Sequence, residues 1–408
     1  MVPNGWKLGT IEEISSVSSG GTPSRKNESY WNGNIPWVTT AEVKFNIIED
    51  TAEKITEEGL ANSSAKLFPV DTILIAMYGQ GKTRGQVAKL GIEASTNQAC
   101  AAIILKAGYR VDYYYQFLIS QYDNIREMAN SGGQENLSGG IVKSIKVPVP
   151  PLPEQNKIAQ ILSTWDKVIS TTEQLLANSQ QQKKALMQQL LTGKKRLLDS
   201  NGVRFSGEWV HGRLGELCTF KGGSAFKEEY QGHSEGDLPF IKVSDMNLRG
   251  NEKYIGYANN WLTDQAAKEL KAKAFPKDTI VFAKVGAALL LNRRRILFRP
   301  TIIDNNMMAA IPTKFGDTEF IYQLMLAVDF AKLVQEGAVP SVNQGDLASF
   351  KISYPEKEEQ QKIAAVLSTA EQEITALRQE LAALKQEKKA LMQQLLTGKR
   401  RVKVEEAA

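Results

Sequence analysis

The stretch AMYGQGKTRGQ, from Ala76 to Gln86, holds the residue types of a phosphate-binding loop. Its spacing, Ala76-x-x-x-x-Gly81-Lys82-Thr83, fits the looser form of a P-loop, and the apolar run DTILIA precedes it as a strand would. Such a loop would bind a nucleoside triphosphate through its backbone N–H groups and its lysine. The alternative interpretation is a basic loop that contacts a different polyanion.

The residues after Thr83 argue against nucleotide binding. A P-loop needs a helix that begins at its Lys-Ser/Thr pair, because the helix N-terminus holds the phosphates. Here RGQVAKLGIE follows, and its glycines and spaced apolar residues predict a turn and a strand. The next apolar run, AAIILKAG, ends in Lys106 rather than in the Asp that a magnesium site needs. We therefore predict that this chain does not hydrolyse nucleotides.

An internal repeat gives an independent test. KKALMQQLLTGK occurs at residues 183–194 and again, letter for letter, at 388–399, an offset of 205 residues (388 − 183). EQNKIAQILST faces EQQKIAAVLST at the same offset, and KLFPVDTILIA resembles KAFPKDTIVFA. After that second strand the chain reads VGAALLLNRRR, with no Gly-Lys-Thr. The repeat predicts two copies of one domain-plus-helix unit that share a scaffold strand and differ in the loop after it.

Two long helices end the two copies. Pro-rich segments precede both, and Gly193 and Gly398 stand where helices stop. Apolar residues recur at alternating spacings of four and three, most regularly in the second copy, which predicts a coiled coil. Each helix spans about 38 residues, or roughly 57 Å. We expect the seam to include Ile158, Leu162, Trp165, Leu186, Leu190, Ile363, Leu367, Ile374, Leu381 and Leu391.

The fold class that we predict is α+β. Residues 1–150 and 199–353 alternate short β-type runs with turns rich in Gly and Asn, which indicates two mixed α/β domains in which sheet dominates. The helices occupy residues 151–198 and 354–408. The periodicity does not give the topology of either domain.

Candidate DNA contacts lie where the matched halves differ and in nearby polar loops. Arg, Lys, Gln, Asn and Thr side chains suit phosphates and base edges, although each could also be a solvated loop residue. The first half offers Thr22, Arg25, Lys26, Gln80, Lys82, Thr83, Arg84 and Gln86. The second half offers Lys221, Lys227, Lys284, Arg293, Arg294, Arg295 and Asn305. The polar loops SGGQENLSGG and VPSVNQGDL could contact DNA or simply turn the chain into the helices.

Composition narrows the remaining classes of function. The net charge of +5 and pI of about 8.9 suit a polyanionic partner without proving one. Two isolated cysteines, Cys100 and Cys218, argue against disulfides and zinc modules and favour a reducing cytoplasm. The only histidines, His211 and His233, leave little material for metal or triad chemistry, so we predict no metal site and no catalytic residues. No apolar run approaches the roughly 20 residues of a membrane span.

Taken together, these motifs resemble the specificity subunit of type I restriction–modification systems. The resemblance covers the full length and depends on PPLPEQNKIAQIL and EEQQKIAAVL at the helix starts, KKALMQQLLTGK at both helix ends, and GGTP, IPWVTTAE and MYGQGKTRG in the first domain. It implies that each domain is a target recognition domain that reads one half of a split site in double-stranded DNA. The loop AKVGAALLLNRRR departs from the first-domain loop, so the second-domain residues depend on charge and position alone.

The resemblance also implies partners and cofactors. The helices would pack antiparallel, set the spacing between half-sites, and dock two modification subunits that carry S-adenosylmethionine and methylate adenine. Restriction subunits driven by ATP would join them in the cytoplasm. The chain shows no Asn/Asp-Pro-Pro-aromatic motif of an amino-methyltransferase, so we expect it to be non-catalytic and to hold no cofactor. Two other classes stay open: a scaffold that joins protein-binding modules, and a P-loop enzyme.

Overall fold

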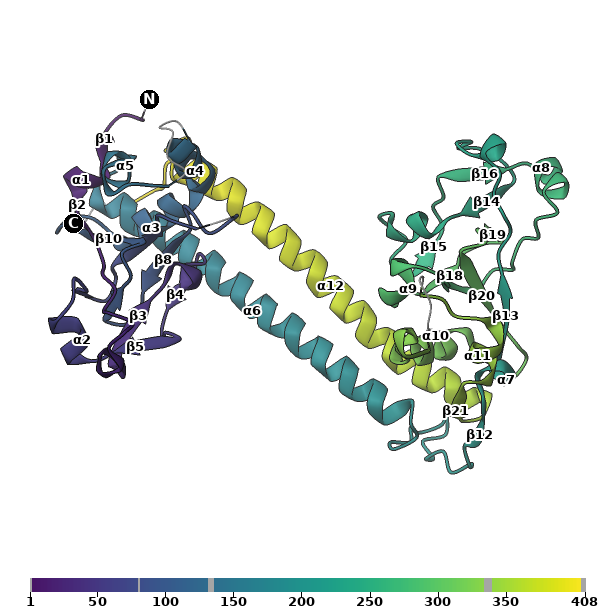
Figure 1. The fold of residues 1–408 in the computed structure, drawn as a ribbon. Helices are drawn as coiled ribbons and strands as arrows, with labels where there is room; N and C mark the ends of the chain where they lie inside the picture. The colour runs from purple at the N-terminus through teal and green to yellow at the C-terminus, as the bar shows by residue number, and fades with distance from the viewer. Residues whose placement is uncertain (1, 80, 131–135, 334–339, 405–408) are drawn as a thin grey trace. The chain divides into compact units, whose positions relative to one another are not determined.

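The computed structural model describes residues 2–79, 81–130, 136–333 and 340–404 of the 408-residue chain. The chain divides into two compact units (Figure 1). Unit 1 comprises Met1–Gln174 and Gln379–Ala408, and unit 2 comprises Leu175–Arg378. Each unit thus joins one predicted domain to part of each predicted helix, and the mixed α/β class with an internal repeat is confirmed.

Sheets dominate the globular part of unit 1. In its described residues a five-stranded sheet has the order β2-β10-β7-β8-β4, and a four-stranded sheet has the order β5-β3-β9-β6. The first sheet consists of β2 (Ser15–Ser19), β10 (Cys100–Leu105), β7 (Ile73–Ala76), β8 (Val87–Leu90) and β4 (Ile47–Ile48). The second consists of β5 (Glu53–Ile55), β3 (Trp31–Val38), β9 (Ala94–Thr96) and β6 (Leu67–Phe68). β1 (Lys7–Thr10) pairs separately with β11 (Lys146–Val149).

Unit 2 repeats this plan within its described residues. Its five-stranded sheet follows the corresponding order, β13-β20-β17-β18-β15, and a three-stranded sheet has the order β16-β14-β19. The strands are β13 (Cys218–Gly222), β20 (Met307–Pro312), β17 (Ile280–Ala283), β18 (Arg295–Leu297), β15 (Tyr254–Ile255), β16 (Asn260–Leu262), β14 (Leu238–Ile241) and β19 (Ile302–Ile303). β12 (Val210–Arg213) pairs with β21 (Lys351–Tyr354) as β1 pairs with β11.

Short helices connect and cover the sheets. Unit 1 contains α1 (Ile11–Ile14), α2 (Glu57–Ala61), α3 (Val111–Ser120), α4 (Tyr122–Asn130) and α5 (Gly139–Ser144). Unit 2 contains α7 (Leu214–Leu217), α8 (Asp264–Glu269), α9 (Ala287–Leu290), α10 (Thr318–Ala327) and α11 (Gln344–Ser349). Single 3₁₀ turns cover Glu28–Tyr30, Thr40–Glu42, Glu228–Tyr230, Val243–Asn247 and Phe330–Leu333.

Strand β7 shows why DTILIA becomes a central strand. All four residues of β7 are buried, and successive side chains of a strand point to opposite faces. Ile73 and Ile75 join the core on one face, whereas Leu74 and Ala76 join a second core shared with the four-stranded sheet. A continuous apolar run is needed here because both faces of the sheet are covered.

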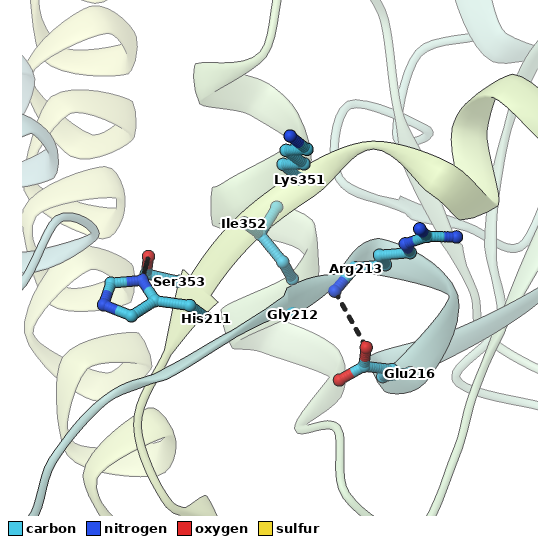
Figure 2. A pocket seen from close by; sticks show the side chains of 7 residues that line it. All are labelled: His211, Gly212, Arg213, Glu216, Lys351, Ile352 and Ser353. Atoms are coloured by element: carbon cyan, nitrogen blue, oxygen red, sulfur yellow. Dashed lines mark hydrogen bonds between the residues drawn. The ribbon is translucent and has the colours of Figure 1, made fainter.

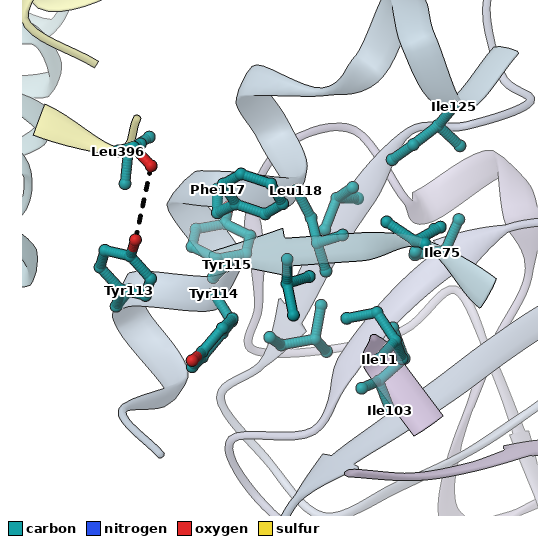
Figure 3. Packing of buried hydrophobic residues seen from close by; sticks show 14 of the residues in the cluster. Ile11, Ile75, Ile103, Tyr113, Tyr114, Tyr115, Phe117, Leu118, Ile125 and Leu396 are labelled. Carbon is teal, nitrogen blue, oxygen red and sulfur yellow. Dashed lines mark hydrogen bonds between the residues drawn. The ribbon is translucent and has the colours of Figure 1, made fainter. Parts of the chain in front are cut away.

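The larger core of unit 1 also includes the end of the chain's last long helix (Figure 3). Tyr113, Tyr114 and Phe117 of α3 are almost fully buried among isoleucines of α1 and the sheet. The Tyr113 hydroxyl lies 3.5 Å from the backbone oxygen of Leu396 and donates to it. The C-terminal segment is therefore part of the folding unit that contains the N-terminus.

The two long helices are α6 (Leu152–Leu190) and α12 (Lys357–Leu395), which lie inside the predicted helical ranges. Unit 1 pairs Asp166 with Lys388, and Glu173 with Lys385. Unit 2 pairs Lys183 with Glu371. In unit 1 rising numbers on α6 meet falling numbers on α12, so the paired segments run antiparallel.

The predicted seam residues differ in their burial. Six are buried: Ile158, Leu162, Leu190, Ile363, Leu367 and Ile374. Four are only partly buried: Trp165, Leu186, Leu381 and Leu391. Across the described ranges, no helix combines the length and apolarity that crossing a bilayer requires.

Candidate nucleic-acid interface

The loop between β7 and β8 is a hairpin with a firmly held base. The backbone N–H of Ala76 donates to Gln86 O at 3.0 Å, and that of Gly85 donates to Ala76 O at 2.9 Å. From the opposite side, the N–H of Leu137 donates to Met77 O at 3.0 Å. The first two bonds hold the ends of the loop together, and the third holds Met77 against the segment before α5.

This geometry rules out the P-loop interpretation. The residues after Thr83 form strand β8, antiparallel to β7, and no helix begins at Lys82-Thr83. A triphosphate would lack the helix N-terminus that a P-loop supplies. The prediction from the sequence that a turn and a strand follow Thr83 is confirmed.

The predicted contacts of the first loop differ in accessibility. Lys82 is exposed, whereas Thr83, Arg84 and Gln86 are partly buried. Gln80 lies outside the described residues. The described part of the loop therefore presents one exposed cation, Lys82, with partly buried polar side chains beside it.

The other first-domain candidates lie in the segment before β3. Thr22 donates to the side chain of Gln98, and Lys26 is exposed. The guanidinium of Arg25 binds both carboxylate oxygens of Glu53, with one contact of 2.8 Å, and lies 3.7 Å over the Trp31 ring. The charge of Arg25 is thus already paired within the domain, which the sequence did not indicate.

The second domain replaces the hairpin loop with a helical turn. Strand β17 leads into α9 and then into Arg293, Arg294 and Arg295 before and at the start of β18. Arg293 is exposed and donates to Asn247. Lys284 is partly buried and lies beside Gly222, where a Cβ added to the glycine would be 3.3 Å from the lysine Nζ. The loop residue Asn305 is exposed.

Two of the three arginines do not fit the predicted role. Arg294 is only 1 % exposed, and its guanidinium stacks 3.8 Å over the Phe330 ring, so the prediction that it contacts DNA is wrong. Burial lowers the pKa of Arg294 to about 9. Arg295 is partly buried, its side chain donates to Arg294 O and Met246 O, and burial lowers its pKa. Both side chains serve the fold of the domain.

Two lysines of the second domain stay accessible. Lys221 and Lys227 are exposed, although Lys227 lies 3.5 Å from the Glu229 carboxylate. The Gln344 side chain lies on the same side of Gly222 as Lys284: a Cβ added to that glycine would be 3.9 Å from the Gln344 amide nitrogen. Gln344 belongs to the polar VPSVNQGDL segment, so the sequence pointed to the segment without singling out this residue.

A hollow of about 520 Å³ lies beside the β12–β21 pair (Figure 2). His211 Nδ1 is 2.8 Å from Ser353 Oγ, which raises the question of a nucleophile and its base. The corresponding pair in unit 1 is Leu8 and Pro148, so the repeat does not preserve the chemistry. Glu216 accepts from the backbone N–H of Arg213 at 3.0 Å and closes a helix cap. The hollow is best explained as the outer edge of the sheet.

Metal and thiol chemistry find no support in the described part of the chain. No cluster of three His, Cys, Asp or Glu side chains is placed there to hold a metal ion. Cys100 and Cys218 are buried, and burial raises the pKa of each thiol to about 12, which disfavours the reactive thiolate.

The helix contacts, in contrast, repeat between the units. Asp166–Lys388 in unit 1 corresponds, at the 205-residue offset, to Glu371–Lys183 in unit 2. At the helix ends, Arg401 binds the buried Glu154 in unit 1, as Arg196 binds the buried Glu359 in unit 2. The repeated residues therefore build one scaffold twice, while the β7–β8 and β17–β18 connections diverge.

Comparisons with known proteins agree with this division. The model of the "Type I restriction modification DNA specificity domain" matches twice, over residues 3–178 and 206–386. The MjaIX specificity subunit of Methanocaldococcus jannaschii is 26 % identical over 374 residues, 87 % of this chain and 84 % of that protein. The EcoR124I/EcoR124II specificity subunit of Escherichia coli is 31 % identical over 170 residues, 41 % of this chain and 42 % of that one.

The fold also has a solved relative. The S subunit of a type I restriction-modification system from M. genitalium superposes with a TM-score of 0.61 at 17 % identity, covering 97 % of this chain and 96 % of that one. Two matched specificity domains on a repeated helical scaffold make this chain a member of the family of type I restriction–modification specificity subunits.

Proposed function

We propose that this chain reads a bipartite DNA site, with one half-site for each specificity domain. The observation that carries the proposal is the divergence of two connections on one repeated scaffold. Strands β7 and β17 correspond, yet a Gly-rich hairpin follows the first and helix α9 follows the second. Divergent loops on a shared frame are what reading two different sequences requires.

In the first domain the hairpin loop supplies the contacts. Lys82 is exposed for phosphate, and Thr83 and Gln86 offer hydrogen-bonding groups beside it. In the second domain the accessible candidates are Lys221, Lys227, Arg293 and Asn305. The buried Arg294 and partly buried Arg295 are left out of this proposal.

The long helices set the spacing and dock the partners. Each has 39 residues, and a helix of that length measures about 58 Å. Val168 and Leu175, seven positions apart on α6, are 42 % and 50 % exposed, and a partner helix would bury them. Because each scaffold contact occurs once in each unit, the helices would offer equivalent surfaces to two copies of one partner, the modification subunit.

The chemistry would belong to those partners. The modification subunits would carry S-adenosylmethionine and methylate adenine, and restriction subunits would use ATP. This chain would contribute sequence selection and would itself be non-catalytic.

Binding to the DNA motif that a map of adenine methylation in the host identifies, measured against salt, tests the proposal. The full chain with its co-purifying partners should lose affinity steeply as salt rises, because lysines and arginines release counterions from phosphates. Lys82→Ala should reduce the slope of log affinity against log salt by about one if it contacts a single phosphate. Glu173→Gln, on α6, is a matched control that should leave the slope unchanged. Affinity that is independent of salt and of sequence would instead indicate a protein scaffold.

A further inference from the structure

Tyr122, at the start of α4, lies directly behind the described half of the hairpin loop. Its hydroxyl donates to the backbone oxygen of Lys82 at 2.6 Å. The same hydroxyl accepts from Arg126 Nη1, also at 2.6 Å. One side chain thus connects the loop backbone to a cation one helical turn further along α4.

The Tyr122 ring is itself fixed on two sides. Phe45 meets it edge-on, with ring centroids 5.2 Å apart and planes at 87°. The Arg126 guanidinium carbon lies 5.4 Å from the ring centroid. Together these contacts restrict the ring to one orientation.

The loop needs an external support because its own backbone is permissive. Gly79, Gly81 and Gly85 adopt φ values of 139°, 64° and 84°, a region that glycine enters without strain. Gly85 also allows close packing, since a Cβ there would lie 3.0 Å from Arg126 Cγ. The segment from Lys82 to Gln86 is therefore pressed against α4, and Tyr122 supplies the polar bond at its tip.

We propose that Tyr122 is a positioning residue for DNA recognition by the first domain. By holding Lys82 O, it sets the direction in which the Lys82 and Thr83 side chains leave the loop, without touching DNA itself. Its bond to Arg126 keeps the hydroxyl hydrogen directed at the carbonyl, since the oxygen already accepts from the guanidinium. The proposal rests on the proposed role of the loop in binding DNA.

In the second domain a different residue holds the connection between β17 and β18. A change at Tyr122 should therefore affect only the half-site that the first domain reads. The Asn292 amide donates to Val328 O at 3.2 Å and its oxygen accepts from the N–H of Phe330 at 3.1 Å. An asparagine two residues after α9 thus does there what a tyrosine does in the first domain.

The test uses Tyr122→Phe in the full chain with its co-purifying partners. This change removes the hydroxyl and keeps the ring that packs on Phe45. The probes are duplexes that carry the mapped motif intact, with the first half scrambled, or with the second half scrambled. Loss of the hydroxyl removes both its bond to Lys82 O and its bond from Arg126, and it should weaken discrimination at one half-site by about five- to tenfold.

The affected half-site must be the one that Lys82→Ala also affects, with the other half-site unchanged. Arg126→Met should produce the same half-site effect, and the double variant should add little to it, because both act through one hydroxyl. Tyr230→Phe is the matched control, since it removes a tyrosine hydroxyl bonded to Glu269 in the second domain. Thermal unfolding of all variants identifies any that fail to fold.

The outcomes separate the two proposals. If the wild-type complex binds all duplexes alike, the proposed DNA-reading function fails. If the wild type discriminates and Tyr122→Phe matches it at both half-sites, or loses both half-sites equally, the positioning role alone is overturned.

Discussion

Replacing Glu371 with Gln should destabilise unit 2 through a single change of charge. The Glu371 carboxylate lies 2.9 Å from Lys183 Nζ on α6 and 3.2 Å from Lys253 Nζ, which belongs to the globular part of the unit. It also accepts from the Gln323 amide at 3.2 Å. One carboxylate therefore connects both long helices to the second domain, and Glu371→Gln keeps its shape while removing its charge.

The size of the effect follows from the burial of the three groups. The side chains of Glu371, Lys183 and Lys253 are 24 %, 13 % and 21 % exposed. Breaking a fully buried pair costs about 3–5 kcal/mol, and breaking an exposed pair about 0–1. Lys253 keeps a second partner, Glu319, at 2.9 Å, so the loss falls mainly on Lys183. We expect a loss of about 2 kcal/mol, between these limits.

The pH dependence gives this prediction a second readout. Burial alone would raise the pKa of Glu371, but the attraction of Lys183 and Lys253 outweighs it and leaves the pKa lowered. A lowered pKa in the folded state means that the stabilisation is present at neutral pH and is lost as the pH falls through the folded-state pKa. The difference between wild type and Glu371→Gln should therefore shrink below about pH 4.3, the ordinary value for Glu.

Scanning calorimetry of the full chain measures the effect. A unit of about 200 residues should show a melting transition lowered by about 5 °C. Glu373→Gln is the control, because that exposed carboxylate accepts from the Ser179 hydroxyl and its change should alter stability by less than about 0.5 kcal/mol. The reasoning fails if Glu371→Gln lowers the melting temperature no more than the control does. It also fails if the double variant with Lys183→Met loses the sum of the two single losses, because the two changes break the same ion pair.

Two further predictions address the site and the scaffold. Arg294→Met should leave DNA affinity unchanged, because that side chain is buried, whereas Arg293→Ala should weaken binding in the same titration; equal losses would show that Arg294 reaches DNA after all. Gly398→Ala should destabilise unit 1 by about 2 kcal/mol, because φ is 72° and a Cβ would lie 2.4 Å from Pro3 Cγ. Gly202→Ala is its control, because φ there is 79° and nothing lies within 4 Å of an added Cβ. If both changes lowered the melting temperature equally, the contact with Pro3 would cost nothing.

The parts of the fold that follow from local pattern were predictable. The repeat at an offset of 205 residues and the heptad spacing of Ile363 and Leu367 predicted two helices, because periodic burial leaves a mark on sequence. The apolar run at Ile73–Ala76 predicted a strand for the same reason. The turn after Thr83 was predictable because its glycines exclude a helix that begins at Lys82.

The parts that depend on distant contacts were not predictable. Arg293 and Arg294 are identical in type and adjacent in sequence, yet only the second is buried, because the Phe330 ring, 36 positions away, covers it. The pairing of Arg25 with Glu53 is likewise a product of the tertiary fold. No pattern within the segment distinguishes an arginine that binds DNA from one that packs on an aromatic ring.

The support of the β7–β8 loop by Tyr122 was missed for a related reason. Tyr122 lies 40 positions after Lys82, in a helix whose sequence gives no sign of a functional role. Only the placement of α4 behind the hairpin brings the hydroxyl to the loop carbonyl.

A genome-wide map of adenine methylation, in the host with and without this gene, tests the central claim most directly. The account predicts that deletion removes one split motif with two defined halves and a fixed spacer, and that Lys82→Ala in the restored gene relaxes only one of the halves. An unchanged map, while the gene is expressed with its partners, would contradict the claim that this chain selects the methylated sequence.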